Sequence, residues 1–325
     1  MTNPKENPKF LHLALHIHES LFKAPICIGG FYNHHLAFNG EFHLYPAKKG
    51  QLADYDIIFV GVSRPELDGV MLSKIRQELG WDSQTKVVAC IDYAIELWGG
   101  IPSPTFNPHS LETELLQADM IFVSEPMMRQ HVRSLINDRK PVQFIMHPTN
   151  VQAVRTMSKP INMRTDEIAA IIHRYDNNWM DPYLVTKDLP WDTWAVLLDP
   201  AIQIHLYAYY KFMREGGEFV PYLDWVSRKK VVLDSYHRIH TYGRTAVDNA
   251  CLGVPTVGAD WTYAQKMLWP DLTAQAGDTL AQTVMVKKLF EDESFYLDCI
   301  EKAAETVEIF SYENRKKEFL EKLYN

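Results

Sequence analysis

Short apolar runs rich in β-branched residues alternate with segments of helical periodicity along most of the chain. Such runs predict strands, and apolar residues three or four positions apart predict helices. Strands are expected at 10–17, 55–62, 86–91, 119–123, 142–146, 168–172, 194–198, 230–233 and 254–257, and helices at 66–79, 111–118, 124–135, 201–214, 223–229, 244–252, 263–269, 280–290 and 312–323. This alternation predicts an α/β fold built on parallel sheets.

A polar segment bounded by Pro148 and Pro160 interrupts the alternation near the middle of the chain. Proline and polar residues between two periodic regions are typical of a domain boundary. A chain of 325 residues also exceeds what one hydrophobic core usually serves, so two domains are expected. The expected division is a first domain over 1–155, a second over 156–308 and a terminal helix over 309–325.

The composition is that of an ordinary globular protein. Apolar residues make up 46% of the chain and charged residues 23%, which excludes extended disorder. No run approaches the roughly 18 apolar residues of a membrane span, so no integral membrane segment is expected. The four cysteines lie far apart, which favours reduced thiols in a cytoplasmic protein. The formal net charge of −8 weighs against broad binding to nucleic acid or anionic membranes.

The segment 230–260 carries the most informative pattern. An apolar strand is followed by a polar loop, Gly243, a short helix and a second strand. The N–H groups and positive dipole at the start of such a helix hold phosphate groups, and a glycine lets a ligand approach the backbone. Asp248, one turn further in, is placed to bind a pair of ribose hydroxyls. The alternative is a capping box from Thr245 to Asp248, in which the carboxylate only satisfies backbone donors.

The spacing resembles the donor-binding segment of GT-B glycosyltransferases, particularly glycosyltransferase family 4. In that family two acids flank seven residues within a Gly…Glu-Ala…Gly-x-Pro frame. Here His240 and Asp248 flank seven residues, and Asp248 to Pro255 fits the second half. His240 departs from the usual Glu, which leaves the sugar contact and the stereochemistry open. The run from Ala118 to Pro126 resembles the Ala-Asp…Ser-Glu segment of the family's amino-terminal domain.

The resemblance implies two Rossmann-like domains facing across a cleft, with the last helix returning to the first domain. It implies a nucleotide-sugar co-substrate, expected to be UDP-linked, and no other cofactor. The diphosphate is expected at the backbone of Gly243, Arg244 and Thr245, and the ribose at Asp248. The further donor-side candidates, from the resemblance or from their placement, are Gly29, Gly30, Arg174, Tyr222 and Tyr242, with His240 at the diphosphate or the sugar.

The acceptor side is expected at the carboxyl ends of the first domain's strands. Asp92 directly follows an apolar strand, where a carboxylate can deprotonate an acceptor hydroxyl or orient the donor sugar. A helix N-cap is the equal alternative for Asp92. His18, beyond the first strand, is a second catalytic candidate. Histidines at 12, 16, 18, 34 and 35 raise the alternative of a metal site, but no acidic cluster or zinc-helix spacing accompanies them, so no catalytic metal is expected.

We therefore expect a metal-independent glycosyltransferase that moves a sugar from a nucleotide diphosphate to an acceptor hydroxyl. The acceptor stays open among glycans, small molecules and modified DNA. A phage-type DNA glycosyltransferase acting on hydroxymethylated pyrimidine bases fits the chain's size but not its acidity. A GT-B epimerase would use the same donor site without an acceptor. A non-catalytic module would bind the nucleotide sugar and turn nothing over.

Overall fold

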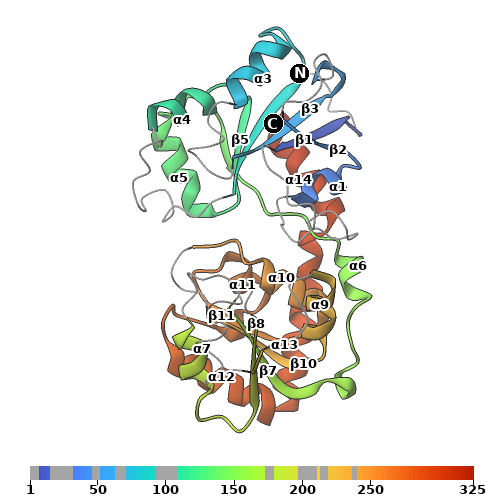
Figure 1. The fold of residues 1–325 in the computed structure, drawn as a ribbon, viewed down its shortest axis with the longest axis vertical. Coiled ribbons are helices and arrows are strands. Elements are labelled where there is room, and N and C mark those ends of the chain that lie inside the picture. The colour runs from blue at the N-terminus through green and yellow to red at the C-terminus, as the bar shows by residue number, and fades with distance from the viewer. Residues whose placement is uncertain are drawn as a thin grey trace. The chain divides into compact units, whose positions relative to one another are not determined.

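The computed structural model describes residues 7–14, 32–45, 52–62, 71–92, 108–172, 179–196, 211–212, 219–235 and 240–325. The chain forms two compact units (Figure 1). The first combines Met1–Thr149 with Phe310–Asn325, and the second is Asn150–Ile309. The segment expected to be a linker contains a short helix, α6, which belongs to the second unit.

The described strands of the first unit form one parallel sheet in the order β2-β1-β3-β4-β5-β6. The strands are β1 Phe10–Ala14, β2 Glu41–Leu44, β3 Ile57–Val62, β4 Lys86–Ile91, β5 Met120–Val123 and β6 Val142–Phe144. The order reverses between β1 and β3, so chain connections leave this point in opposite directions. In open parallel sheets the crevice outside the carboxyl ends of the strands at such a reversal is where ligands bind.

Helices cover both faces of this sheet (Figure 1). Their apolar residues pack into two separate cores, which explains why β3 is buried along its full length and reads as a continuous apolar run. One face carries α3 Met71–Leu79, α4 Pro108–Leu115 and α5 Pro126–Leu135, and the other carries α1 Asn33–Ala37 and α14 Tyr312–Tyr324. The terminal helix α14 therefore belongs to the first unit, as the resemblance implied.

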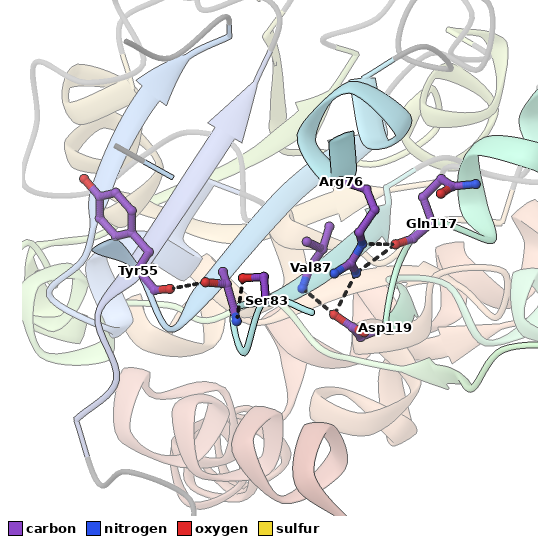
Figure 2. A network of polar contacts seen from close by, with 7 residues as sticks. Tyr55, Arg76, Ser83, Val87, Gln117 and Asp119 are labelled. Atoms are coloured by element: carbon purple, nitrogen blue, oxygen red, sulfur yellow. Dashed lines mark hydrogen bonds and ion pairs between the residues drawn. The ribbon is translucent and has the colours of Figure 1, made fainter. Parts of the chain in front are cut away.

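The amino-terminal edge of the first sheet is closed by a polar network (Figure 2). Arg76, on α3, donates to the Gln117 carbonyl oxygen at 2.9 Å and to Asp119 Oδ2 at 2.9 Å. The same Asp119 oxygen accepts the backbone N–H of Val87 at 2.7 Å. This network ties α3 to the starts of β4 and β5, at the end of the sheet opposite the expected ligand crevice.

The described strands of the second unit form a parallel sheet in the order β12-β11-β10-β7-β8-β9. The strands are β7 Thr165–Ile171, β8 Asp192–Val196, β9 Lys211–Phe212, β10 Lys229–Asp234, β11 Thr256–Ala259 and β12 Thr273–Ala274. Here the order reverses between β7 and β10. The carboxyl end of β10, which leads to the Gly243 turn, is thus at the reversal.

The helices of the second unit group around α10 and around α12. α10 contacts α6, α9, α11 and α13, whereas α12 contacts α7 and α13. Their bounds are α6 Val151–Arg155, α7 Met180–Thr186, α9 Phe219–Ser227, α10 Arg244–Leu252, α11 Tyr263–Leu268, α12 Thr279–Glu291 and α13 Glu293–Thr306. Short 3-10 turns occupy Leu52–Asp54, Ile161–Met163, Pro270–Leu272 and Val307–Phe310.

One sequence-based expectation is wrong in the second unit. A helix was expected over 201–214, but Lys211–Phe212 is a strand that pairs with β8 at Trp194 and Ala195. Aromatic residues favour strands as much as helices once a neighbouring strand is present, so tertiary pairing overrides the helical spacing. Among the described residues, no helix is both long enough and apolar enough to cross a bilayer.

Candidate functional site

The turn before α10 is built around Gly243, whose φ of +88° lies in the left-handed region that favours glycine. A Cβ at this position would overlap the Thr262 methyl group. The turn is held against the following loop, because the Ala264 N–H donates to the Tyr242 carbonyl oxygen at 2.9 Å. Gly243 is the N-cap of α10 and provides no side-chain cap. The first N–H groups of a helix have no partner within the helix, so this turn offers donors and a positive dipole to an anion.

Asp248 lies one turn into α10 and is paired with Arg244. The Arg244 Nε donates to Asp248 Oδ1 at 2.7 Å, and the two side chains are 15% and 3% exposed. Burial raises the pKa of Asp248, while the Arg244 charge opposes this rise. Burial lowers the pKa of Arg244, but the charge and the hydrogen bond of Asp248, with smaller contributions from Tyr242 and Cys251, together leave that pKa raised. The capping-box alternative is wrong, because the N-cap is Gly243 and Asp248 bonds a side chain.

Two further ionisable residues, Asp234 and Tyr222, belong to the same region. Asp234 ends β10 at the strand-order reversal and is buried, which raises its pKa to about 6, partly opposed by a hydrogen bond from Thr245. Burial also raises the pKa of Tyr222, on α9, and the Asp248 and Asp234 charges add to the rise. The sequence analysis missed Asp234. Its signal was available, since it is a carboxylate at the carboxyl end of an apolar strand.

Of the other donor-side candidates, two lie just before the turn. His240 stacks on Trp261, with ring centroids 4.6 Å apart and an interplanar angle of 14°. Tyr242 is buried beside Gly243. The structure therefore brings Tyr222, Tyr242, Gly243, Arg244, Thr245 and Asp248 into one region of the second unit, and His240 precedes the turn in the chain. Gly29, Gly30, Arg174 and His18 lie outside the described residues.

In the first unit, Asp92 follows β4 directly, at the carboxyl edge of the sheet. Its Oδ1 lies 2.8 Å from His147 Nε2 and accepts the Ser124 hydroxyl at 2.7 Å. His147 is in turn 3.3 Å from His34, nitrogen to nitrogen. Ser124, His147 and His34 were not predicted as site residues. Ser124 and His147 do follow predicted strands, so their position was a signal that the sequence analysis did not use.

Metal ligation was a weighed alternative for the histidines. Within the described ranges, no group of three or more His, Cys, Asp and Glu side chains is arranged to hold a metal ion. His12, the histidine of β1, instead packs among aromatic rings, with Phe42 at 4.9 Å and Phe59 at 5.0 Å between ring centroids. Burial lowers its pKa well below the usual histidine value.

No protein family and no curated protein matches the chain in sequence. Solved structures do match it. An alpha-glucosyltransferase in complex with UDP-glucose and DNA containing an abasic site is 12% identical, with a TM-score of 0.70 over 98% of this chain and 99% of that one. A trehalose-6-phosphate synthase is 8% identical, with a TM-score of 0.71 over 97% and 98%. A structure described as trehalose-6-phosphate from E. coli bound with UDP-2-fluoro glucose is 9% identical, with a TM-score of 0.69 over 97% and 99%.

The chain has the GT-B fold. Its neighbours span it almost end to end, and the two parallel-sheet units and the terminal helix of the first unit agree with that fold. The predicted fold class is therefore confirmed. The Gly243 turn comes after β10, a strand at the order reversal of the second sheet, and it contacts the loop that follows β11. In this fold class the crevice at such a reversal is where ligands bind.

Proposed function

We propose that the protein is a glycosyltransferase that moves a glycosyl group, glucose in the first instance, from a UDP-linked donor to an acceptor hydroxyl. The observation that carries the proposal is the Gly243 turn. It combines an uncapped helix start, a left-handed glycine and the His240–Asp248 spacing, and it follows β10, a strand at the reversal of the second sheet. The chain also shares its fold with structures bound to UDP-glucose and UDP-2-fluoro glucose, which supports the choice of donor.

The donor roles follow from the chemistry of each group. The backbone N–H groups from Gly243 to Thr245 face the diphosphate, and Arg174 adds a guanidinium suited to phosphate oxygens. Asp248 binds the ribose hydroxyls, and the hydrogen bond from Arg244 fixes the position of its carboxylate. Tyr222, together with Tyr242, lines the nucleotide side. Gly29 and Gly30 stay donor-side candidates from the resemblance.

The reaction forms a bond between the acceptor oxygen and C1 of the sugar and breaks the bond from C1 to the diphosphate oxygen. The acceptor proton leaves with a base, and UDP departs carrying the electron pair of the broken bond. A helix dipole, backbone donors and arginine stabilise this negative charge without a metal ion. His240 contacts the diphosphate or the sugar, and Asp92, with His18 as the second candidate, meets the acceptor hydroxyl.

We further propose that the protein belongs to glycosyltransferase family 4 and that it is cytoplasmic. The Asp248 to Pro255 frame supports the family, and His240 in place of a Glu is the one departure in that motif. The buried, unpaired thiols of Cys90, Cys251 and Cys299 support a reducing compartment.

A second candidate acceptor, hydroxymethylated DNA, is favoured by one observation. Two of the similar structures hold DNA, one of them a 13-mer with a HMU base. The formal charge of −8 opposes general DNA binding. Gel retardation with hydroxymethylated duplex DNA, at low and at high salt, tests whether DNA is the acceptor. Retention that falls steeply with salt supports DNA, and no retention at low salt removes it.

A thermal-shift panel of nucleoside diphosphates and nucleotide sugars tests the proposal. A ligand at one hundred times its Kd adds about 2.7 kcal/mol of stability, and UDP and UDP-glucose are expected to give the largest shifts. The Asp248→Asn variant, measured against its own ligand-free Tm, should lose most of the shift. Asp298→Asn, which changes an exposed acid on α13, is the matched control and should keep it.

Product analysis separates the alternatives that share this donor site. Incubation with UDP-glucose and a panel of acceptors should yield a glycosylated product. An epimerised nucleotide sugar or free epimerised sugar from donor alone would identify an epimerase instead. Binding without turnover on any acceptor would identify a non-catalytic module, and no shift with any nucleotide would remove the proposal.

A further inference from the structure

Asp92 is held in one orientation by two donors that bond the same carboxylate oxygen. Its Oδ1 lies 2.8 Å from His147 Nε2 and 2.7 Å from Ser124 Oγ. The Asp92 side chain is nevertheless 36% exposed. Asp92 is therefore anchored through one oxygen, while part of its side chain faces solvent.

His147 supplies the inner anchor from a buried position. Its side chain is 3% exposed, and it sits three residues beyond β6 in the first unit. The Nε2 atom faces Asp92, while Nδ1 lies 3.3 Å from His34 Nε2. The hydrogen-bond pattern assigns the roles: His147 Nε2–H donates to Asp92, and His147 Nδ1 accepts from His34 Nε2–H.

His34 fixes this arrangement from behind because it stays neutral. It is buried on α1, and burial lowers its pKa well below the usual histidine value, with His147, His12 and Arg315 lowering it further. A neutral His34 has one N–H to give, and the geometry aims it at His147 Nδ1. Its ring also packs on Phe59 with centroids 4.8 Å apart, which restricts its rotation. The hydrogen bonds therefore run from His34 to His147 and from His147 to the Asp92 carboxylate.

We propose that His147 is a positioning residue for the glycosyl transfer, which orients the Asp92 carboxylate toward the acceptor hydroxyl. The inference rests on the proposed function and adds the residues that set the acceptor side. Asp92 accepts a hydrogen bond from the acceptor O–H and so orients the acceptor oxygen. Ser124 provides the second anchor. Both anchors follow strands of the same sheet, so the fold itself sets the direction of the carboxylate.

Replacing His147 should lower the reaction rate by the amount expected when a reacting group loses its orientation. A misplacement of about 1 Å in a reacting group costs on the order of 10²-fold in rate. The loss should appear in kcat and in the KM for the acceptor. Donor binding should not change, because neither His147 nor Asp92 is among the donor-binding residues proposed above. A split of this kind is not expected from general loss of stability.

Two substitutions separate the hydrogen bond from packing. His147→Leu removes the donor and keeps an apolar side chain in the buried site. His147→Gln keeps a side-chain N–H close to the Nε2 position and removes the imidazole. Ser124→Ala removes the weaker anchor. His131→Leu, an exposed histidine on α5, is the control for general effects of losing a histidine.

The readouts are UDP-glucose turnover, with water, glucose 6-phosphate and hydroxymethylated duplex DNA as acceptors, and the Kd for UDP by calorimetry. His147→Leu should lower kcat by on the order of 10²-fold with an unchanged Kd for UDP. His147→Gln should recover most of that loss. A folded His147→Leu enzyme with wild-type kcat overturns the inference, and so does a His147→Gln enzyme as defective as His147→Leu.

A measurement without turnover keeps this inference distinct from the proposed function. The ¹⁵N shifts of the imidazole report which nitrogen carries hydrogen in the intact wild-type protein. His147 Nε2 should be protonated at neutral pH, and a bare Nε2 overturns the inference whatever the enzyme does. If Nε2 is protonated but UDP neither binds nor is formed, the proposed function is wrong. His147 then has no role in glycosyl transfer, although the hydrogen-bond assignment holds.

Discussion

The two edges of the first sheet hold their carboxylates with different kinds of partner. At the amino-terminal edge, Asp119 bonds the Arg76 guanidinium and the Val87 N–H (Figure 2). At the carboxyl edge, Asp92 bonds His147 and the Ser124 hydroxyl. The two carboxylates are similarly exposed, Asp119 at 31% and Asp92 at 36%. Only the first has an arginine as its counter-charge.

In the second sheet the amino-terminal edge again carries an ion pair, and the carboxyl edge carries a carboxylate bonded by a hydroxyl. At its amino-terminal edge Glu167 bonds Lys229, whose ammonium lies 5.1 Å from the Trp194 ring centroid. At its carboxyl edge Asp234 is buried with its pKa raised to about 6, and Gly243 adopts a left-handed conformation. Uncompensated burial and positive φ values cost stability and cluster at functional sites. The contrast predicts that changes at the amino-terminal edges act on stability alone, and changes at the carboxyl edges act on ligand binding.

The largest effect on stability is expected from Arg76→Ala. This change leaves Asp119 partly buried without its counter-charge and removes the donors to the Gln117 carbonyl oxygen. Breaking one side of a buried ion pair costs about 3–5 kcal/mol, which chemical denaturation would measure. The thermal shift produced by UDP, relative to the variant's own Tm, should be unchanged.

A matched variant shows whether burial is the reason. Arg133 pairs with Asp138 on the surface, at the end of α5. Arg133→Ala should leave stability unchanged, because exposed ion pairs contribute little. An equal loss in both variants, or a UDP response lost in Arg76→Ala, would contradict the division of roles between the two edges.

Much of the fold was predictable because its elements have clear local boundaries. The expected strand 86–91 and helix 244–252 agree with β4 and α10, since each is a run of consistent spacing bounded by polar residues or glycine. The strand β2 and the helix α1 were not predicted. They have four and five residues, too few to show a period. β9 was missed because its pairing with β8 is not encoded in its own two residues.

The candidate site was predictable only where its residues are close in sequence. Gly243, Arg244 and Asp248 lie within one turn of a recognisable helix start, so the pattern located them together. The Asp92–His147 contact joins residues 55 positions apart, and only the strand order brings them to one edge. The Arg244 pairing is an i,i+4 contact and could have been inferred from helical spacing.

An intermediate effect is expected from Gly243→Ala, at the carboxyl edge of the second sheet. The added methyl group would overlap the Thr262 side chain and would force a non-glycine residue to a φ of +88°. Overpacking and the left-handed conformation together cost about 2–4 kcal/mol. The variant should also lose the UDP response, because relief of the overlap moves the backbone donors.

Gly277 provides the control for this prediction. Its φ of +83° is similar, but a Cβ there would meet nothing within 4 Å. Gly277→Ala should therefore lose only about 1 kcal/mol, and its UDP response should match the wild type. If the Gly243→Ala protein binds UDP normally, the turn is not part of the donor site. The proposed difference between the two edges of the sheet is then wrong.

An effect of opposite sign is expected at Asp234. Its pKa in the folded protein is about 6, above the value of about 3.9 for an unfolded chain. Between these values the folded state keeps a proton that the unfolded state releases, so this residue's contribution to stability falls as pH rises from about 4 to 6. Asp234→Asn cannot titrate, so its stability relative to the wild type should rise by about 2 kcal/mol between pH 4 and pH 7. Denaturation curves across that range measure the difference, with Asp271→Asn, an exposed acid, as the control. A variant that is less stable than the wild type at pH 7 would contradict this prediction. It would mean that the interactions of the charged Asp234 offset the free-energy cost of burying it.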